Sequence, residues 1–211
     1  MVKPVKLSKR LQQIEQMVSE KYDHIWDCCC DHGFLGAALL DSVPANPRTI
    51  HFVDIVPKLM QSLEQKLVRF YQGKRWHTHC LDVADIPLNT FSGRHLIIIA
   101  GIGGDLMIEL ICALKARHPT LALDFLLCPV HHQFALRKTL QKLDLRLVAE
   151  SLIKDNRRFY EIIHVTSSQY GEVVSPIGES IWRSECSHQT MIIKEYLSKT
   201  LGHYRRMTQG G

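Results

Sequence analysis

Residues 24–36 read HIWDCCCDHGFLG, and this stretch sets the fold class. Residues 24–30 predict a short buried strand, and residues 33–40 predict a helix directly after it. A tight turn from a strand into a helix presents backbone N–H groups to a ligand. Gly33 suits this turn, because a glycine lets a ligand approach the backbone closely. The stretch therefore predicts the first unit of an α/β sheet with a ligand site at its end.

Strands and helices alternate through most of the remaining chain, which predicts a parallel sheet covered by helices on both faces. The expected strands span residues 49–54, 75–81, 96–100 and 121–127, and the expected helices span residues 58–71, 105–117 and 133–143. Near the end, residues 145–153 and 159–165 predict two strands joined as a hairpin through Lys-Asp-Asn-Arg-Arg. A parallel sheet with a closing antiparallel hairpin resembles the Rossmann-like class I methyltransferase fold, which has seven strands.

The two ends of the chain frame this core. Ser8 is expected to cap a helix over residues 8–19, whose apolar residues fall at helical spacing. Residues 170–178 are typical of a linker, and residues 179–207 predict a long helix or a broken pair of helices. We therefore expect one domain over residues 1–168 and a short helical C-terminal extension over residues 169–211.

Length and composition exclude several classes of protein. The 211 residues fit one domain with a short appendage, and 45% hydrophobic with 22% charged residues excludes a disordered chain. No apolar run reaches the roughly 18 residues of a membrane span, and the start MVKPVKLSKR lacks the apolar segment of a secretory signal. Seven cysteines, three of them consecutive, suit a reducing compartment, so we expect a cytoplasmic protein without a disulfide framework.

Basic residues outnumber acidic ones by 26 to 21, and their placement is more informative than the net charge of +5. One cluster near the N-terminus includes Lys9 and Arg10, a second includes Arg157 and Arg158, and a third marks the C-terminal end. Each cluster can be ordinary solvated surface charge. Clusters that converge in the fold would instead form a face that binds phosphate groups.

Suggestive groups follow four successive strands, at the edge where doubly wound sheets bind ligands. Asp27 lies in the first strand, before the turn at Asp31–Gly33, and Asp54 ends the second, where a carboxylate can accept both ribose hydroxyls. Asp82 follows the third strand, where it can accept from an adenine amino group. The fourth strand ends in Ala100-Gly-Ile-Gly-Gly104, whose glycines indicate a sharp bend or a close approach of the backbone.

The order and spacing of these pieces resemble the bacterial tRNA (adenine-N1) methyltransferase family that modifies position 22 of tRNA. The resemblance spans about Leu7 to Val165 and rests on LSKRL (7–11), DCCCDH (27–32) with Leu35, IAGIGG (99–104) and FYEII (159–163). It implies S-adenosylmethionine (SAM) as cofactor, tRNA as partner and a helical C-terminal extension, here a short one. The family has glycine where Cys29 stands. The implied cofactor-binding residues are Asp27, Cys29, Asp31, Gly33, Asp54, Ile55, Asp82, Val83, Ala100 and Gly101.

The resemblance also implies a reaction. Adenine N1 has an in-plane lone pair and can attack a sulfonium methyl without prior deprotonation, so positioning supplies most of the acceleration. Asp31 would stabilise the positive charge that develops on the base, and His32 would orient the base or accept a proton. The target must be unpaired or flipped out, and Phe34, Phe159 and Tyr160 are candidates to stack on it. The expected substrate-binding residues are Lys9, Arg10, Gly103, Gly104, Arg157, Arg158 and Tyr160.

Other functions stay open to different degrees. Zinc binding by Cys28, Cys30 and His32 is disfavoured, because no second cysteine pair stands nearby and adjacent strand residues alternate faces. The same buried strand disfavours a cysteine nucleophile, and a nicotinamide-dependent oxidoreductase would need a G-x-G-x-x-G turn that is missing. A methyltransferase of another RNA site or of a small molecule remains an alternative, as does a non-catalytic RNA-binding relative. We expect no metal, no membrane contact, and a monomer or weak homodimer.

Overall fold

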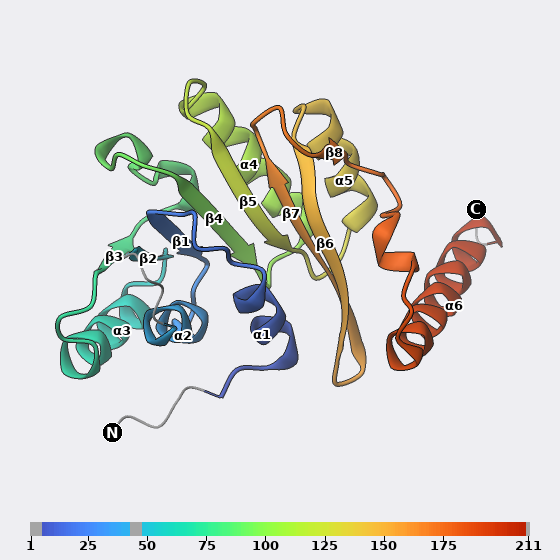
Figure 1. The fold of residues 1–211 in the computed structure, drawn as a ribbon, viewed down its shortest axis with the longest axis horizontal. Helices are drawn as coiled ribbons and strands as arrows, with labels where there is room; N and C mark the ends of the chain where they lie inside the picture. The colour runs from blue at the N-terminus through green and yellow to red at the C-terminus, as the bar shows by residue number, and fades with distance from the viewer. Residues whose placement is uncertain (1–5, 43–47, 210–211) are drawn as a thin grey trace.

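The computed structural model describes residues 6–42 and 48–209, and its centre is a twisted eight-stranded sheet (Figure 1). The strand order is β3-β2-β1-β4-β5-β7-β6-β8. The first five strands run parallel, whereas β7 is antiparallel to both β5 and β6. The strands are β1 (His24–Cys28), β2 (Thr49–Asp54), β3 (Trp76–Cys80), β4 (His95–Ala100), β5 (Leu123–Cys128), β6 (Arg146–Asp155), β7 (Arg158–Thr166) and β8 (Glu172–Val173).

This architecture confirms the predicted mostly parallel sheet with a closing antiparallel hairpin. The sheet has eight strands rather than seven, because Glu172–Val173 pairs with the start of β6 as an additional short strand. That segment lies inside the expected linker, so part of the C-terminal extension belongs to the sheet. The division into a domain over 1–168 and an extension over 169–211 stays a prediction.

Helices cover both faces of the sheet, and each face has its own apolar core. On one face, α1 (Lys9–Gln16), α2 (Phe34–Asp41) and α3 (Pro57–Phe70) pack against residues such as Ile25. On the other face, α4 (Gly104–Arg117) and α5 (Gln133–Lys142) pack against residues such as Trp26. Neighbouring residues of a strand point to opposite faces, so a strand buried on both faces reads as a continuous apolar run.

Several element ends differ from the expectation. The first strand stops at Cys28 instead of reaching residue 30, because Cys29 turns the chain with a φ of 56°. The expected helix over 8–19 ends at Gln16. The β6–β7 turn contains only Asn156 and Arg157, with Asn156 at a φ of 55°, as tight hairpin turns require. The expected helix over 179–207 is a 3₁₀ turn at Ser180–Trp182 followed by α6 (Ser187–Gln209).

Gly36 lets α2 lie directly on β2. A Cβ atom on Gly36 would stand 2.2 Å from Cε1 of Phe52, whose ring is fully buried. Replacing Gly36 with alanine is expected to cost about 2–3 kcal/mol of unfolding free energy, as overpacked cores do. Urea unfolding measures the loss. The control is Gly202→Ala in α6, where the nearest atom is 3.6 Å away; this change should stabilise the helix by up to about 1 kcal/mol. Equal effects of the two changes would contradict the packing argument.

Histidines from four adjacent strands form a cluster on the α4–α5 face, in which His51 and His95 are buried and His24 and His79 are half-buried. His24 Nδ1 lies 3.0 Å from His51 Nε2, and His51 Nδ1 lies 3.0 Å from His79 Nε2. His95 accepts from the Trp26 indole at 3.1 Å, and the Trp26 and His51 rings stack with centroids 3.8 Å apart. Burial and the neighbouring histidines lower the pKa of His51 to about 2, and burial lowers the pKa of the other three as well.

These histidines predict a loss of stability in mild acid. In the unfolded chain they bind protons below about pH 6.5, whereas the folded cluster binds them only at lower pH, so acid favours unfolding. We expect the unfolding free energy to fall by about 2 kcal/mol or more per pH unit between pH 6 and pH 5. Asp27 acts in the opposite direction by roughly one proton. Burial raises the pKa of Asp27 to about 7, so in this pH range the folded state binds a proton that the unfolded chain does not.

Unfolding of wild type and His51→Gln across this pH range measures the effect. The variant should lose about 1.4 kcal/mol per pH unit from the slope, and the exposed His188→Gln should leave the slope unchanged. A wild-type slope near zero would contradict the assignment of the cluster as neutral.

The C-terminal extension is fastened to the sheet by a buried charged group. Arg137 of α5 is 1% exposed, donates from Nε to Glu161 at 2.8 Å and pairs with Glu150 at 2.7 Å. Arg137 also donates to the Ser175 carbonyl, and the Tyr196 hydroxyl of α6 donates to Glu161 at 2.6 Å. In Figure 1, α6 lies beside the β6–β7 hairpin, away from the parallel part of the sheet.

Among the described residues, no helix is both long and apolar enough to cross a membrane.

Candidate functional site

The strand order reverses between β1 and β4, which is the point where doubly wound sheets form a ligand crevice at their carboxyl edge. From β1 the chain proceeds outward to β2 and β3, and then returns to β4 on the other side. Ligands of doubly wound sheets bind at such a point. The predicted candidate groups lie at or just after the ends of β1, β2, β3 and β4, so they all lie along this edge.

The turn after β1 is built from alternate left-handed residues. Cys29, Asp31 and Gly33 have φ values of 56°, 50° and 69°. A left-handed conformation costs a non-glycine residue roughly 1–2 kcal/mol, so two strained positions meet in one turn, as is common at functional sites. Gly33 faces the core, because its Cβ would meet Leu63 at 2.6 Å. Its small size therefore lets the turn pack against Leu63 of α3, and its approach to a ligand stays a prediction.

Asp27 is buried and caps the helix that follows. Its Oδ2 accepts from the Gly36 N–H at 2.9 Å, inside the first turn of α2. Burial raises the pKa of Asp27 to about 7. Asp27 therefore holds the N-terminus of α2 in place at the crevice, and its own carboxylate is largely shielded from solvent.

Asp54 links the turns that follow β1 and β2, which together with the turns after β3 and β4 form the four corners of the site. Its Oδ2 accepts from the Asp31 N–H at 3.1 Å and its Oδ1 accepts from the Val56 N–H at 3.0 Å. Between them, Ile55 is 64% exposed. The carboxylate is only half-buried, and each oxygen keeps a further lone pair for a ligand.

Asp82 forms the third corner. It caps a 3₁₀ turn at Val83–Asp85, and its Oδ1 accepts from the Ala84 N–H at 2.8 Å. The Val83 side chain is buried in the core, so only its backbone faces the edge. Burial and the charges of Asp54, Asp27 and Asp82 raise the pKa of the Cys29 thiol to about 11. Cys29 is therefore an uncharged, half-buried group among three carboxylates.

Asp31 and His32 project from the first turn into solvent. Their side chains are 68% and 51% exposed, and His32 Nε2 lies 3.7 Å from Asp31 Oδ1. The His32 ring is 5.7 Å from the ring of Phe34, which is 49% exposed. These three side chains are accessible to a substrate at the carboxyl edge.

The glycine corner after β4 is joined to the loop after β5 by backbone hydrogen bonds. Gly101 donates to the Cys128 carbonyl at 3.1 Å, and Gly104 donates to the His131 carbonyl at 3.0 Å. A Cβ on Gly104 would stand 2.8 Å from that carbonyl oxygen, and one on Gly103 would stand 2.4 Å from the His131 ring. Close approach of the β5 loop therefore explains the two glycines. His131 was not predicted from the sequence, because its contact with Gly103 depends on how the loops after β4 and β5 dock.

Arg10 and Tyr160 meet at this edge although they are far apart in sequence. The Arg10 guanidinium lies 5.1 Å from the centroid of the Tyr160 ring, and the Arg10 N–H donates to Asp155. A Cβ on Gly101 would lie 3.4 Å from Arg10 Nη1, so the pair borders the glycine corner. The start of β7 reaches this edge because β7 is antiparallel to β5.

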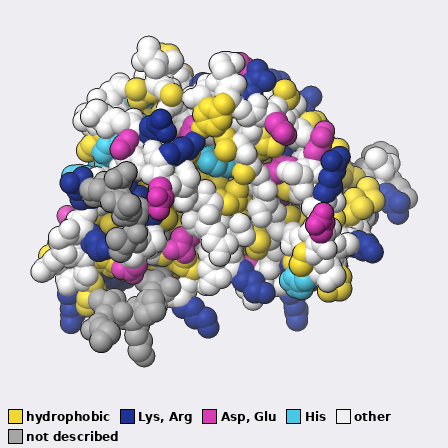
Figure 2. Space-filling model, viewed as in Figure 1, with side chains coloured by type: hydrophobic (Ala, Val, Ile, Leu, Met, Phe, Trp, Pro, Cys, Tyr) yellow, Lys and Arg dark blue, Asp and Glu magenta, His cyan; other side chains and the backbone are white. Residues whose placement is uncertain are grey.

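Other predicted substrate residues are not part of this cluster. Arg157 and Arg158 lie at the exposed tip of the β6–β7 hairpin, and Lys9 is exposed on α1. Phe159 packs against Tyr196 of α6, with ring centroids 5.4 Å apart, rather than beside the crevice. Figure 2 shows Lys and Arg side chains scattered over this face of the molecule, without a single basic patch.

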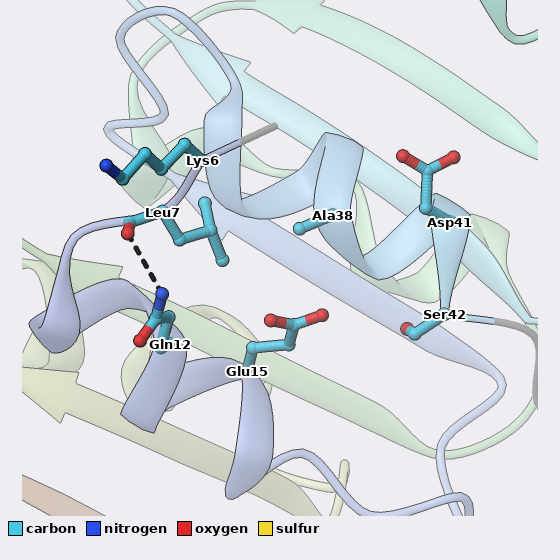
Figure 3. Close-up of a pocket in the computed structure, with 7 residues that line it drawn as sticks. All are labelled: Lys6, Leu7, Gln12, Glu15, Ala38, Asp41 and Ser42. Carbon is cyan, nitrogen blue, oxygen red and sulfur yellow. Dashed lines mark hydrogen bonds between the residues drawn. The ribbon is translucent and has the colours of Figure 1, made fainter. Parts of the chain in front are cut away.

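A separate hollow lies between α1 and α2 (Figure 3). Its lining includes Glu15 and Asp41, and Gln12 donates to the Leu7 carbonyl at 3.1 Å. This hollow is at the carboxyl end of α2, whereas the crevice is at the amino end. None of the predicted site residues lines it. Among the described residues, no group of three or more His, Cys, Asp or Glu side chains is arranged to hold a metal ion.

The solved structures that resemble this chain have the same fold. Streptococcus pneumoniae Sp1610, a putative tRNA (m1A22) methyltransferase, matches with a TM-score of 0.79 and 19% identity, over 97% of this chain and 89% of that chain. M. capricolum TrmK in complex with S-adenosylhomocysteine (SAH) matches with a TM-score of 0.76 and 18% identity, over 95% and 86%. The B. subtilis m1A22 tRNA methyltransferase TrmK matches with a TM-score of 0.68 and 19% identity, over 98% and 89%.

No curated protein matches the sequence of the chain. A model of the methyltransferase domain matches residues 7–163, which is most of the chain and includes β1 to β7 nearly complete. Together with the strand order and the corner groups, this match shows that the chain belongs to the methyltransferase-domain family.

Proposed function

We propose that this protein is a SAM-dependent methyltransferase that acts on N1 of an adenine in tRNA, at position 22. The observation that carries the proposal is the row of acidic corners after β1, β2 and β3, continued by the glycine corner after β4, along one edge of a methyltransferase-family sheet. The similar structures described as tRNA (m1A22) methyltransferases, one holding SAH, support the choice of cofactor and substrate.

The residues present fit SAM. Asp54 has free lone pairs for the ribose hydroxyls, and Asp82 stands at the next corner, where an adenine amino group would be accepted. Asp27 fixes the first turn of α2, whose N-terminus suits the carboxylate of the methionine part. Cys29, Gly33, Ile55, the backbone of Val83, Ala100 and Gly101 complete the proposed wall. When bound, SAM supplies an electrophilic methyl group on a sulfonium sulfur.

The chain's own residues would orient the target base and accommodate its charge. Arg10 and Tyr160 form a flat cationic and aromatic surface beside Gly101, on which a flipped-out adenine can stack. Asp31, exposed at the end of β1, would stabilise the positive charge that grows on the base, and His32 would help to orient it. Gly103 and Gly104 have no side chains, so they leave space at this corner for the base.

Binding of tRNA would use the basic residues around this edge. Lys9 on α1 and Arg157 with Arg158 at the hairpin tip are exposed and can reach phosphate groups. Because such contacts release counterions, we expect affinity for tRNA to weaken steeply as salt rises. We further propose that the protein acts in the cytoplasm, and that it does so as a monomer or weak homodimer.

The test is methylation of unmodified tRNA transcripts with SAM labelled in its methyl group, followed by nucleoside analysis. The proposal predicts 1-methyladenosine in transcripts that carry adenosine at position 22 and none in transcripts that carry guanosine there. A panel of small amines should accept no label. Methylation of a small molecule alone, or tight tRNA binding without any methyl transfer, would overturn the proposal in favour of the corresponding alternative.

A further inference from the structure

The loop after β5 places an imidazole beside the glycine corner of β4. A Cβ atom on Gly103 would stand 2.4 Å from Cε1 and 2.7 Å from Nε2 of His131. The edge of the ring that contains Cε1 and Nε2 therefore packs directly on Gly103. Under the proposed function, the glycine corner that this ring covers lies between the methyl donor and the target base.

His131 has an exposed side chain, and its ring nitrogens form no hydrogen bond with any residue that the structure describes. The imidazole is thus free to bond to a substrate. In its neutral form with a proton on Nδ1, Nε2 is a hydrogen-bond acceptor.

A second histidine and a carboxylate hold this ring in place. The His132 ring meets the His131 ring edge to face, with centroids 4.4 Å apart. His132 Nδ1 lies 2.7 Å from Asp105 Oδ2, which ties His132 to the first turn of α4. His132 has a φ of 61°, a strained conformation for a residue with a side chain. Backbone hydrogen bonds between the loops after β4 and β5 also hold the backbone of His131 in place.

We propose, building on the proposed function, that His131 Nε2 accepts a hydrogen bond from the exocyclic amine of the target adenine during methyl transfer. The N1 lone pair of adenine forms the new N–C bond while the C–S bond of the donor breaks, and the electrons of that bond stay on sulfur. No proton moves, and the positive charge passes to the base, where the exocyclic amine shares it. That amine becomes a stronger donor as the reaction proceeds, so an acceptor beside it binds the transition state better than the ground state.

His131 is therefore a catalytic residue for this reaction, and His132 with Asp105 are positioning residues. Asp31 follows β1 and His131 follows β5, the two strands that flank β4, so the two groups would contact the base from different sides. An acceptor at the amine also favours adenine over guanine and hypoxanthine, which carry a carbonyl oxygen at that position.

Single-turnover methylation with saturating tRNA and SAM tests the role of His131. His131→Phe keeps a ring but removes the acceptor, and it should lower the rate constant about 10- to 100-fold, the value of one charge-assisted hydrogen bond. The tRNA concentration at half-maximal rate and the Kd of SAH should stay within threefold. His131→Gln places an amide oxygen near the position of Nε2 and should recover most of the rate. The control is His188→Phe, an exposed histidine of α6, which should react like wild type.

A wild-type rate in His131→Phe would overturn the inference, and so would a His131→Gln variant as slow as His131→Phe, because the ring would then only fill space. Asp105→Asn tests the positioning pair. As a single substitution it should lower the rate of methyl transfer, and when added to His131→Phe it should lower the rate no further. Wild-type protein that forms no 1-methyladenosine would instead refute the proposed function, and the inference with it. Active wild type with an unaffected His131→Phe refutes the inference alone.

Discussion

Replacing Asp54 with alanine is expected to weaken SAH binding 100- to 1000-fold and to abolish detectable methyl transfer. The carboxylate would accept the ribose hydroxyls, and charge-assisted hydrogen bonds contribute about 1.5–3 kcal/mol each. It also accepts the Asp31 and Val56 N–H groups, so its loss separates the first corner from the second. Two lost bonds near the lower end of this range correspond to about 3–4 kcal/mol, which gives the stated factor.

Isothermal titration with SAH measures the effect of this change. Asp54→Asn keeps one carbonyl acceptor and should lie between wild type and Asp54→Ala. The control is Asp41→Ala, which removes an exposed carboxylate at the far end of α2 that accepts from the Tyr71 hydroxyl and from no other side chain of the described residues. Its Kd for SAH should match wild type within twofold. An Asp54→Ala variant that binds SAH within threefold of wild type would contradict the assigned corner.

Replacing Arg137 with alanine is expected to cost about 3–5 kcal/mol of unfolding free energy. Arg137 and Glu150 have side chains that are 1% and 0% exposed, so the change leaves two carboxylates buried without their cation. The charges of Glu161 and Glu150 raise the pKa of Arg137 against the opposing effect of burial, so the arginine is charged in the fold. The C-terminal extension should also loosen, because Ser175, Ser180 and Tyr196 bond to the same charged group.

Denaturant unfolding and limited proteolysis measure the two consequences of this change. Arg117→Ala is the matched control, since Arg117 pairs with Asp85 at 2.6 Å but both side chains are 53% exposed. An exposed pair is worth about 0–1 kcal/mol. Proteolysis of Arg137→Ala should begin between β7 and α6 before the sheet unfolds. Equal costs of the two arginine substitutions would show that burial of the charged group does not govern stability here.

Local pattern was enough to predict most of the fold. The buried runs of β4 and β5 and the polar hairpin before β7 each differ clearly in periodicity from the helices around them. The eighth strand was missed because it is two residues long and has no periodicity of its own. The end of β1 was misplaced because Cys29 adopts a left-handed conformation that cysteine rarely takes, and only its tertiary surroundings enforce it.

The candidate site was predicted where it depends on strand ends, and not where it depends on contacts distant in sequence. Asp54 and Asp82 occupy the expected corners, because parallel strands carry their final residues to one edge. Neither the contact of Arg10 with Tyr160 nor the packing of His131 on Gly103 can be read from spacing, because each depends on how separate elements dock. The glycines after β4 predict a sharp bend or a close approach of the backbone, and the segment that approaches Gly103 and Gly104 is the β5 loop.

A crystal structure of the protein with SAH tests the central claim most directly, namely that a SAM-type ligand lies across the carboxyl edge of β1, β2 and β4. The account predicts the ribose at Asp54, the adenine at Asp82 and Val83, and the sulfur beside Ala100 and Gly101. Density for SAH at any other place, or a crevice filled by Cys29 and its neighbours at saturating SAH, would contradict it.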